Sequence, residues 1–373
     1  MKRIVPVLLK SRVVALGLIL GLPLAGVAGS GKAMAPFLAF PPRTVIKSHA
    51  PFSLPLFLLI LAVILFSLLP LVMKGARYRL PSNHSGKKRL NSRPLPWWGK
   101  LAGLSLAVFW TLAWTRFDWF SPLQAHTFFP IWISLIIVIN AITVKRTGAC
   151  PMTTSPRRFF LLFPVSAAFW WSFEFLNRFV CNWYYTGSQY PALTYFLLAS
   201  LSFSTVLPAV ESMKEYLASF ERLHRGFRHC PALPRAAGKP LGGLFLASGC
   251  ISLAFIALLP DPLFFTLWIS PLFILLGHAL VLDLPHPFDS VITGDLTPVV
   301  TYALAALCCG VFWELFNYDS LARWSYAIPY VQVLHIFEMP LLGYAGYLPF
   351  GLECAMIIHL VDHFKGSAQP AAA

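Results

Sequence analysis

Charged residues are scarce in this sequence, and acidic ones are the scarcest. Of the 373 residues, 12% are charged and only 14 are Asp or Glu. Soluble globular proteins carry about 25% charged residues, so this shortage argues against a soluble enzyme and against a disordered chain. The seven cysteines include no C-x-x-C pair, and no phosphate-binding loop, dinucleotide fingerprint or nucleophile-elbow motif is present. The sequence therefore contains no motif that assigns a particular reaction.

Long apolar runs take the place of the missing charge. Hydrophobic residues make up 57% of the chain, and its mean hydropathy is +0.69. A membrane-spanning helix needs about 20 apolar residues, and continuous rather than alternating runs favour helices over barrel strands. The sequence thus predicts an all-α polytopic integral membrane protein with about 10 transmembrane helices. The predicted spans are 13–29, 53–73, 98–115, 127–144, 159–177, 192–212, 241–259, 263–282, 298–316 and 340–361.

The basic residues predict how these spans are oriented. If the N-terminus is cytoplasmic, 23 of the 29 Lys and Arg residues fall in cytoplasmic segments, as the positive-inside rule requires. The net charge of +15 is then explained by topology, and we expect no nucleic-acid partner. We expect a multi-pass protein of a bacterial-type inner membrane with a cytoplasmic C-terminus. The N-terminus is cytoplasmic if the first span is uncleaved, because 13–29 also fits a signal peptide.

Several short motifs recur about 140 residues later in the chain. Trp132-Ile133-Ser134 returns as Trp268-Ile269-Ser270, and Glu-x-x-Asn occurs at both 174–177 and 314–317. A Trp-x-Tyr segment follows each Glu-x-x-Asn. We therefore predict two tandem, parallel four-helix repeats. The predicted organisation is an N-terminal part of two helices and a basic loop (1–97), a first repeat (98–213), a basic linker (214–240), a second repeat (241–363) and a C-terminal tail (364–373).

The few carboxylates in or beside the apolar spans are the first functional candidates, because an ionisable group in a membrane is costly. The i,i+3 spacing places the Glu and Asn of each pair on one helix face, so the two pairs could converge on one cavity. The predicted catalytic residues are Glu338, Glu174, Glu314, Asn177 and Asn317. The predicted substrate-lining residues are Trp183, Tyr185, Trp324, Tyr326, His335, Glu353 and Glu211. The alternative is that these side chains form interhelical contacts and an interfacial aromatic belt.

Metal and cofactor sites have weaker support in the sequence. His359 and His363 have the helical spacing of a metal-ligand pair, and a loop containing Asp283, Asp289 and Asp295 could hold Mg²⁺ on a diphosphate. A third ligand for the histidines is not evident, and the loop at the corresponding place in the first repeat, 145–158, has no acidic residue. We therefore predict no metal and no cofactor.

A stretch near the C-terminus carries a family resemblance. Trp324, Tyr326, Pro329, Glu338 and Pro340, within 313–343, resemble the outer segment and following helix start of membrane lycopene-cyclase-domain proteins. In this chain Glu338 precedes Pro340, and no adjacent acidic pair is present. The resemblance implies a carboxylic acid that protonates a polyene and aromatic rings that stabilise the resulting carbocation.

Three functions are compatible with these features. The favoured one is an enzyme that modifies a lipid or isoprenoid by carboxylate acid/base chemistry, with membrane lipid and a small hydrophobic substrate as partners. Symmetric carboxylates in parallel repeats also suit a proton- or cation-coupled transporter. A membrane scaffold subunit is the third, in which Glu and Asn only join helices. A cavity that reaches the carboxylates would separate the first two from the third.

Overall fold

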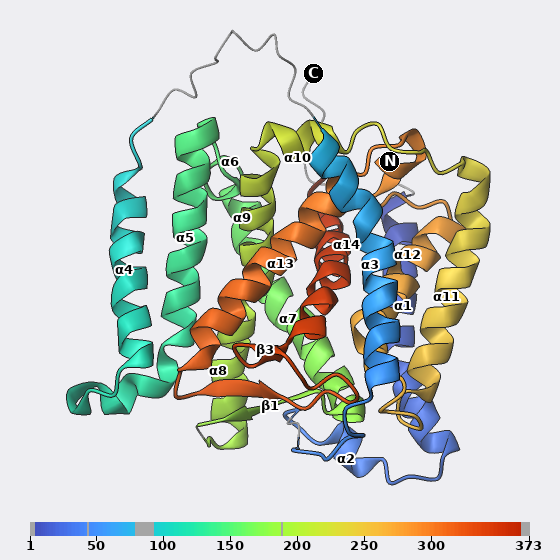
Figure 1. Cartoon of the computed structure of the whole chain (residues 1–373), viewed down its shortest axis with the longest axis horizontal. Coiled ribbons are helices and arrows are strands. Elements are labelled where there is room, and N and C mark those ends of the chain that lie inside the picture. Colours follow the sequence, from blue (N-terminus) through green and yellow to red (C-terminus); the bar gives the residue numbers. More distant parts are fainter. Residues whose placement is uncertain (1–3, 43–44, 79–92, 188, 367–373) are drawn as a thin grey trace.

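The chain folds into a bundle of long helices in the computed structural model (Figure 1). The structure describes residues 4–42, 45–78, 93–187 and 189–366. Part of the predicted basic regions lies outside these ranges, namely Lys2, Arg3, Arg43, Arg79, Lys87, Lys88 and Arg89, as does 367–373 of the predicted tail. The α-helices are α1 (Ile4–Gly29), α2 (Ala35–Leu38), α3 (Leu54–Arg77), α4 (Trp97–Trp114), α5 (Phe128–Thr147), α6 (Pro151–Thr154), α7 (Pro156–Val180), α8 (Ala192–Phe203), α9 (Val206–Ala218), α10 (Glu221–Gly226), α11 (Gly238–Phe255), α12 (Ser270–Val281), α13 (Thr297–Tyr318) and α14 (Tyr347–Gly366).

Seven helical segments of the described residues are long and apolar enough to cross a membrane. They are Leu54–Arg77, Phe128–Thr147, Pro156–Val180, Ala192–Ala218, Arg235–Phe255, Thr297–Tyr318 and Leu341–Asp362. Val13–Gly29 and Ser270–Val281 form shorter apolar helices. Backbone polar groups in hydrocarbon must bond internally, which a helix achieves within one segment. The prediction of an all-α chain compatible with a polytopic membrane protein is therefore confirmed.

Prolines shift the ends of several helices from their predicted positions. The predicted span 192–212 divides at residues 204 and 205 into α8 and α9. Pro208 lies in the first turn of α9, and because proline has no N–H, it cannot continue the α8 hydrogen bonds. The predicted span 340–361 begins as an α-helix only at Tyr347, after the 3₁₀ turn η5 (Leu341–Gly346). Likewise α12 begins at Ser270, beside Pro271, rather than at residue 263.

The core lies where α7, α9, α13 and α14 pack together at the centre of the bundle (Figure 1). Trp132, Phe173 and Phe350 are among its largest fully buried side chains. The helices α11 and α12 approach so closely that a Cβ atom on Gly277 would lie only 2.7 Å from the carbonyl oxygen of Gly242. Small residues permit such close helix contacts in membrane proteins. By contrast α3 buries only Phe57 and exposes apolar side chains along its length, as a lipid-facing helix does.

Two short β-ribbons lie at one end of the bundle. Strand β1 (Trp183–Thr186) pairs antiparallel with β2 (Arg323–Tyr326), in the register Trp183 with Tyr326 and Tyr185 with Trp324. The second ribbon joins β3 (His335–Ile336) to β4 (Met339–Pro340). In Figure 1 both ribbons lie at the end opposite to α10 and to the last turn of α14. The two Trp-x-Tyr segments, far apart in sequence, are thus neighbours in space.

Candidate functional site

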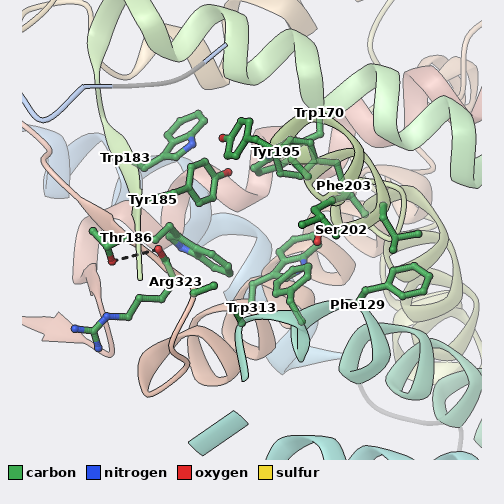
Figure 2. Close-up of a pocket in the computed structure, with 18 of the residues that line it drawn as sticks. Phe129, Trp170, Trp183, Tyr185, Thr186, Tyr195, Ser202, Phe203, Trp313 and Arg323 are labelled. Atoms are coloured by element: carbon green, nitrogen blue, oxygen red, sulfur yellow. Dashed lines mark hydrogen bonds between the residues drawn. The ribbon is translucent and has the colours of Figure 1, made fainter. Parts of the chain in front are cut away.

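A cavity of about 210 Å³ lies beside the β1–β2 ribbon and is walled mainly by aromatic rings. Figure 2 shows Trp183 and Tyr185 from β1 and Trp313 from α13 around one space. The aromatic lining residues are Phe128, Phe129, Trp170, Trp183, Tyr185, Tyr190, Tyr195, Phe203, Trp268, Trp313, Trp324, Tyr326 and Tyr347. Arg323 and His126 are the basic side chains of the lining. The guanidinium of Arg323 points away from the rings (Figure 2).

The ribbon explains why the motif is Trp-x-Tyr. Successive side chains of a strand point to opposite faces, so alternate residues share a face. In β1 these are Trp183 and Tyr185, and both line the cavity, whereas Tyr184 between them does not. Because Trp183 pairs with Tyr326 and Tyr185 with Trp324, the same face of β2 supplies the other two rings. The four predicted aromatic residues therefore form one wall.

Glu174 lies behind this wall and is fully buried on α7. Its Oε1 accepts hydrogen bonds from the indole N–H of Trp170 at 3.0 Å, the indole N–H of Trp183 at 3.0 Å and the hydroxyl of Tyr185 at 2.6 Å. Its Oε2 is buried without a hydrogen-bond partner in the part of the chain that the structure describes. All three donors line the cavity, so this carboxyl group reaches the cavity through single hydrogen bonds.

Glu314 has a closely similar environment on α13 and is also fully buried. Its Oε1 accepts from the hydroxyls of Tyr326 at 2.6 Å and Tyr347 at 2.8 Å. The indole N–H of Trp324 donates in turn to the Tyr326 hydroxyl at 2.8 Å. The Oε2 of Glu314 is buried and has no hydrogen-bond partner among the described residues. Each carboxyl group is thus linked to the cavity by a tyrosine of the ribbon.

The ribbon tyrosines stay protonated in this setting. Burial raises the pKa of the Tyr185 hydroxyl well above its usual range, and the nearby Glu174 carboxylate raises it further. Burial, followed by the Glu314 carboxylate, raises the pKa of Tyr326 in the same way. A phenol that keeps its proton serves as a donor to the carboxylate behind it. The two hydroxyls therefore stand between carboxyl groups and cavity as neutral donors.

The asparagines of the two Glu-x-x-Asn pairs bind the ribbon backbone. Asn177 donates its amide to the carbonyl of Trp183 at 2.8 Å and accepts from the N–H of Asn182 at 2.8 Å. Asn317 donates to the carbonyl of Trp324 at 2.7 Å and accepts from the N–H of the same residue at 2.8 Å. Neither asparagine lines the cavity. They position the strands whose rings form its wall.

Two other predicted residues lie near the ribbon but outside the cavity lining. Glu338 follows β3, with one oxygen 3.5 Å from the Ser325 hydroxyl and the other 3.9 Å from the Arg323 guanidinium. His335 begins β3 and is exposed. Glu338 and His335 therefore lie outside the cavity that Trp183 and Tyr326 line.

Glu211 and Glu353, predicted to line the substrate site, are also absent from the cavity lining. Glu211 on α9 accepts from the Arg158 guanidinium at 2.8 Å and from the Tyr302 hydroxyl at 3.0 Å. Arg158 also pairs with Asp362, so this cluster joins α7, α9, α13 and α14. Glu353 on α14 accepts from the backbone N–H of Leu272 at 3.0 Å, one of the N–H groups left free at the start of α12. Both glutamates hold helices together.

Several cavity residues were not among the predicted site residues. Trp170, Trp268, Trp313 and Tyr347 all line the cavity. Trp268 opens the recurring Trp-Ile-Ser motif, and Trp313 directly precedes Glu314, so the repeat comparison contained a signal for these two. Tyr347 follows Glu314 by 33 positions, and only the packing of α14 against α13 brings it near.

The aspartates of the loop weighed as a metal site form separate contacts in the described structure. Asp283 pairs with Lys239 at 2.6 Å, whereas Asp289 pairs with His286 at 3.2 Å. Within the ranges that the structure describes, no group of three His, Cys, Asp or Glu side chains could hold a metal ion. The side chain of His363 lies outside the described part.

Comparison of the chain with protein-family models, with curated protein sequences and with solved structures finds no match.

Proposed function

We propose that this protein is a membrane-embedded enzyme that receives the reacting part of a lipid or isoprenoid in the aromatic cavity. Glu174 and Glu314 supply the acid and base of the reaction. One observation carries this proposal: each buried carboxyl group is hydrogen-bonded to a tyrosine that lines the cavity, Tyr185 for Glu174 and Tyr326 for Glu314. A scaffold protein has no need of a cavity that connects to its buried carboxyl groups.

The arrangement suits proton transfer to an apolar substrate. In this mechanism one of the two carboxyl groups starts protonated, and its cavity tyrosine relays the proton: the tyrosine hydroxyl gives its proton to the substrate and takes the proton of the carboxylic acid behind it. Positive charge that develops on the substrate is stabilised by the faces of the surrounding tryptophan rings. The second carboxyl group, acting as carboxylate through its own tyrosine, accepts a proton from the product side. The lycopene-cyclase-like resemblance calls for the same chemistry, although we assign the acid to Glu174 or Glu314 rather than to Glu338.

We also infer that the chain is a tandem duplication of a parallel four-helix unit, as the recurring motifs predict. Support comes from paired contacts: Asn177 and Asn317 both bind the carbonyl of the tryptophan that follows, and Glu174 and Glu314 both accept from a ribbon tyrosine. The cavity would then lie between the two units, with one ribbon strand from each.

We infer further that α1 is retained and that both chain ends are cytoplasmic. Helix α1 packs against α11 and α12, and the Ser11 hydroxyl lies 2.8 Å from Nδ1 of His278. Helices α1 and α14 begin and end, respectively, at the α10 end of the bundle (Figure 1). The predicted cytoplasmic basic residues belong to this end, so the cavity would face the opposite side of an inner membrane.

The test is the lipid content of cells that depend on the protein. Glu174→Gln and Glu314→Gln keep the shape of each side chain but remove its proton chemistry. We expect each variant to lose at least about 100-fold in the rate of substrate conversion, the usual size of an acid/base contribution. The measurement is mass spectrometry of lipid extracts, in which the substrate accumulates and the product disappears.

Two further variants complete this experiment. Glu221→Gln is the matched control, because Glu221 lies on α10 and pairs with Arg225 at the other end of the bundle. Glu338→Gln examines whether the acid is the residue that the resemblance indicates. If the lipids are normal in all three variants, Glu174→Gln, Glu314→Gln and Glu338→Gln, the proposal of an enzyme is wrong. Transport or a scaffold role then remains as the function.

A further inference from the structure

We propose that the aromatic cavity recognises an organic cation of trimethylammonium size. This inference rests on the site of the proposed function and goes beyond it, because the rings that would stabilise positive charge on an apolar substrate also bind a stable cation. The observations that carry it are the composition of the wall, the charge behind the wall and the size of the space.

The lining is rich in the aromatic side chains that bind a cation lacking hydrogen-bond donors. The ring centroids of Trp170, Trp183 and Trp268 are 5.3 to 6.5 Å apart, and Trp313 lies 5.9 Å from Tyr347. A quaternary ammonium group is bound by such rings when it lies within about 6 Å of their centroids, and tryptophan binds it best. The five tryptophans of the lining are more than an apolar ligand requires, since Leu or Phe would supply the same apolar surface.

The ionisable side chains that accept hydrogen bonds from the wall are both acidic. Glu174 and Glu314 are fully buried, and each keeps one carboxyl oxygen without a partner in the described structure. Arg178, one turn from Glu174, directs its guanidinium to the carbonyls of Phe37 and Ala39. The proposed mechanism keeps one of these carboxyl groups protonated and the other ionised, so one negative charge lies directly behind the rings, where indole and phenol groups donate to it. A cation in the cavity would therefore be favoured and an anion repelled.

The size of the space decides what part of a molecule enters. At about 210 Å³ the cavity is smaller than the roughly 300–1,000 Å³ of pockets that enclose drug-sized ligands. It accommodates a headgroup-sized cation and not a whole lipid. Such a cation could belong to a free solute or to the headgroup of a membrane lipid, and the experiment separates these sources.

Calorimetric titration of the purified full-length protein in a maltoside detergent tests the inference. Choline and 3,3-dimethyl-1-butanol are the probes, since they have the same shape and differ only in the positive charge. We expect choline to bind at least about tenfold more tightly than its neutral analogue. The double variant Glu174→Gln/Glu314→Gln should lose this preference, whereas Trp119→Phe, at an exposed tryptophan outside the cavity, should keep it.

Equal binding of the two probes, or absence of choline binding, would overturn the proposal, and neither result depends on a variant that must fold. Tighter binding of dihexanoyl-phosphatidylcholine than of choline would assign the cation to a lipid headgroup, and the reverse order to a free solute. A cation preference with unchanged cellular lipids would uphold recognition and reject the catalytic proposal. Altered lipids without a cation preference would do the opposite.

Discussion

Two asparagine side chains hold the strands of the aromatic wall in position. Asn177 and Asn317 each satisfy two backbone groups of the segments that carry the wall tryptophans, and both are buried. The two residues of each Glu-x-x-Asn pair therefore have different roles. The glutamate reaches the cavity through aromatic donors, and the asparagine orients the strand that carries those donors.

Replacing either asparagine should therefore destabilise the protein without touching the cavity chemistry directly. Asn317→Ala leaves the N–H and the carbonyl of Trp324 without partners, at about 1–3 kcal/mol for each buried group. We expect a loss of about 2–5 kcal/mol in the free energy of unfolding, measured by thermal or denaturant unfolding in detergent. Thr186→Ala is the control on the same ribbon, because its hydroxyl contact is 3.5 Å long and its loss should cost under about 0.5 kcal/mol. Equal effects of the two substitutions would contradict the assigned role.

Among the elements, the ribbons and helix breaks have the greatest effect on the site. The pairing of β1 with β2 brings four rings to one face, and the prolines that end the preceding helical hydrogen bonds allow α9 and α14 to start where they pack.

Another contact at the ribbon end joins the segment before α3 to the loop after α11. His49 Nδ1 lies 2.7 Å from Asp261, whose other oxygen accepts the Ala50 N–H at 2.9 Å.

This connection should give the protein a defined response to acid. Partial burial would raise the pKa of Asp261, but hydrogen bonds from His49 and from the Ala50 N–H outweigh it and hold the pKa below its usual range. The folded pKa is thus below the unfolded value of about 3.9. The carboxylate therefore stabilises the fold above that pH, and this stabilisation is lost as the pH falls through the folded pKa.

Asp261→Asn removes that pH-dependent contribution. We expect a loss of about 1–2 kcal/mol at pH 7 and a smaller further loss than in the unsubstituted protein between about pH 4 and pH 2. Unfolding curves in detergent across this range provide the measurement. Asp319→Asn, at an exposed side chain, is the control. Parallel acid profiles for the unsubstituted protein and Asp261→Asn would show that Asp261 contributes nothing to the pH dependence.

In the whole molecule, the two ends of the bundle differ in their structural elements and in their charged residues. The ribbon end carries the aromatic cavity, and the opposite end carries α10 and the last turn of α14 (Figure 1). Lys74, Arg222 and Arg225, which the positive-inside rule places in the cytoplasm, lie on or beside α3 and α10 at that opposite end. The cavity is therefore expected on the non-cytoplasmic side.

Cysteine labelling in intact cells tests this orientation. Gln189→Cys lies at the ribbon end and Arg222→Cys on α10, and both positions are exposed. We expect a membrane-impermeant maleimide to label Gln189→Cys directly and Arg222→Cys only after permeabilisation. The unsubstituted protein is the background control, since its native cysteines are buried or half-buried. The reverse labelling order would invert the inferred topology.

The class of protein is predictable from local sequence, because hydropathy and the length of apolar runs do not depend on the tertiary arrangement. The sequence also identified the buried glutamates, since charge within an apolar span is conspicuous. The sequence predicts the Trp-x-Tyr residues to line one site, but it does not predict that they lie on paired strands.

Which of these residues share a site depends on how the helices pack in three dimensions. Glu174 and Glu314 reach the cavity, whereas Glu211, Glu353 and Glu338 do not line it, although all five have the same side chain. The difference depends on which helix packs against which: Tyr347 meets Glu314 because α14 lies on α13, and Arg158 meets Glu211 because α7 lies on α9. Contacts between residues far apart in sequence are set by packing, which no local pattern encodes.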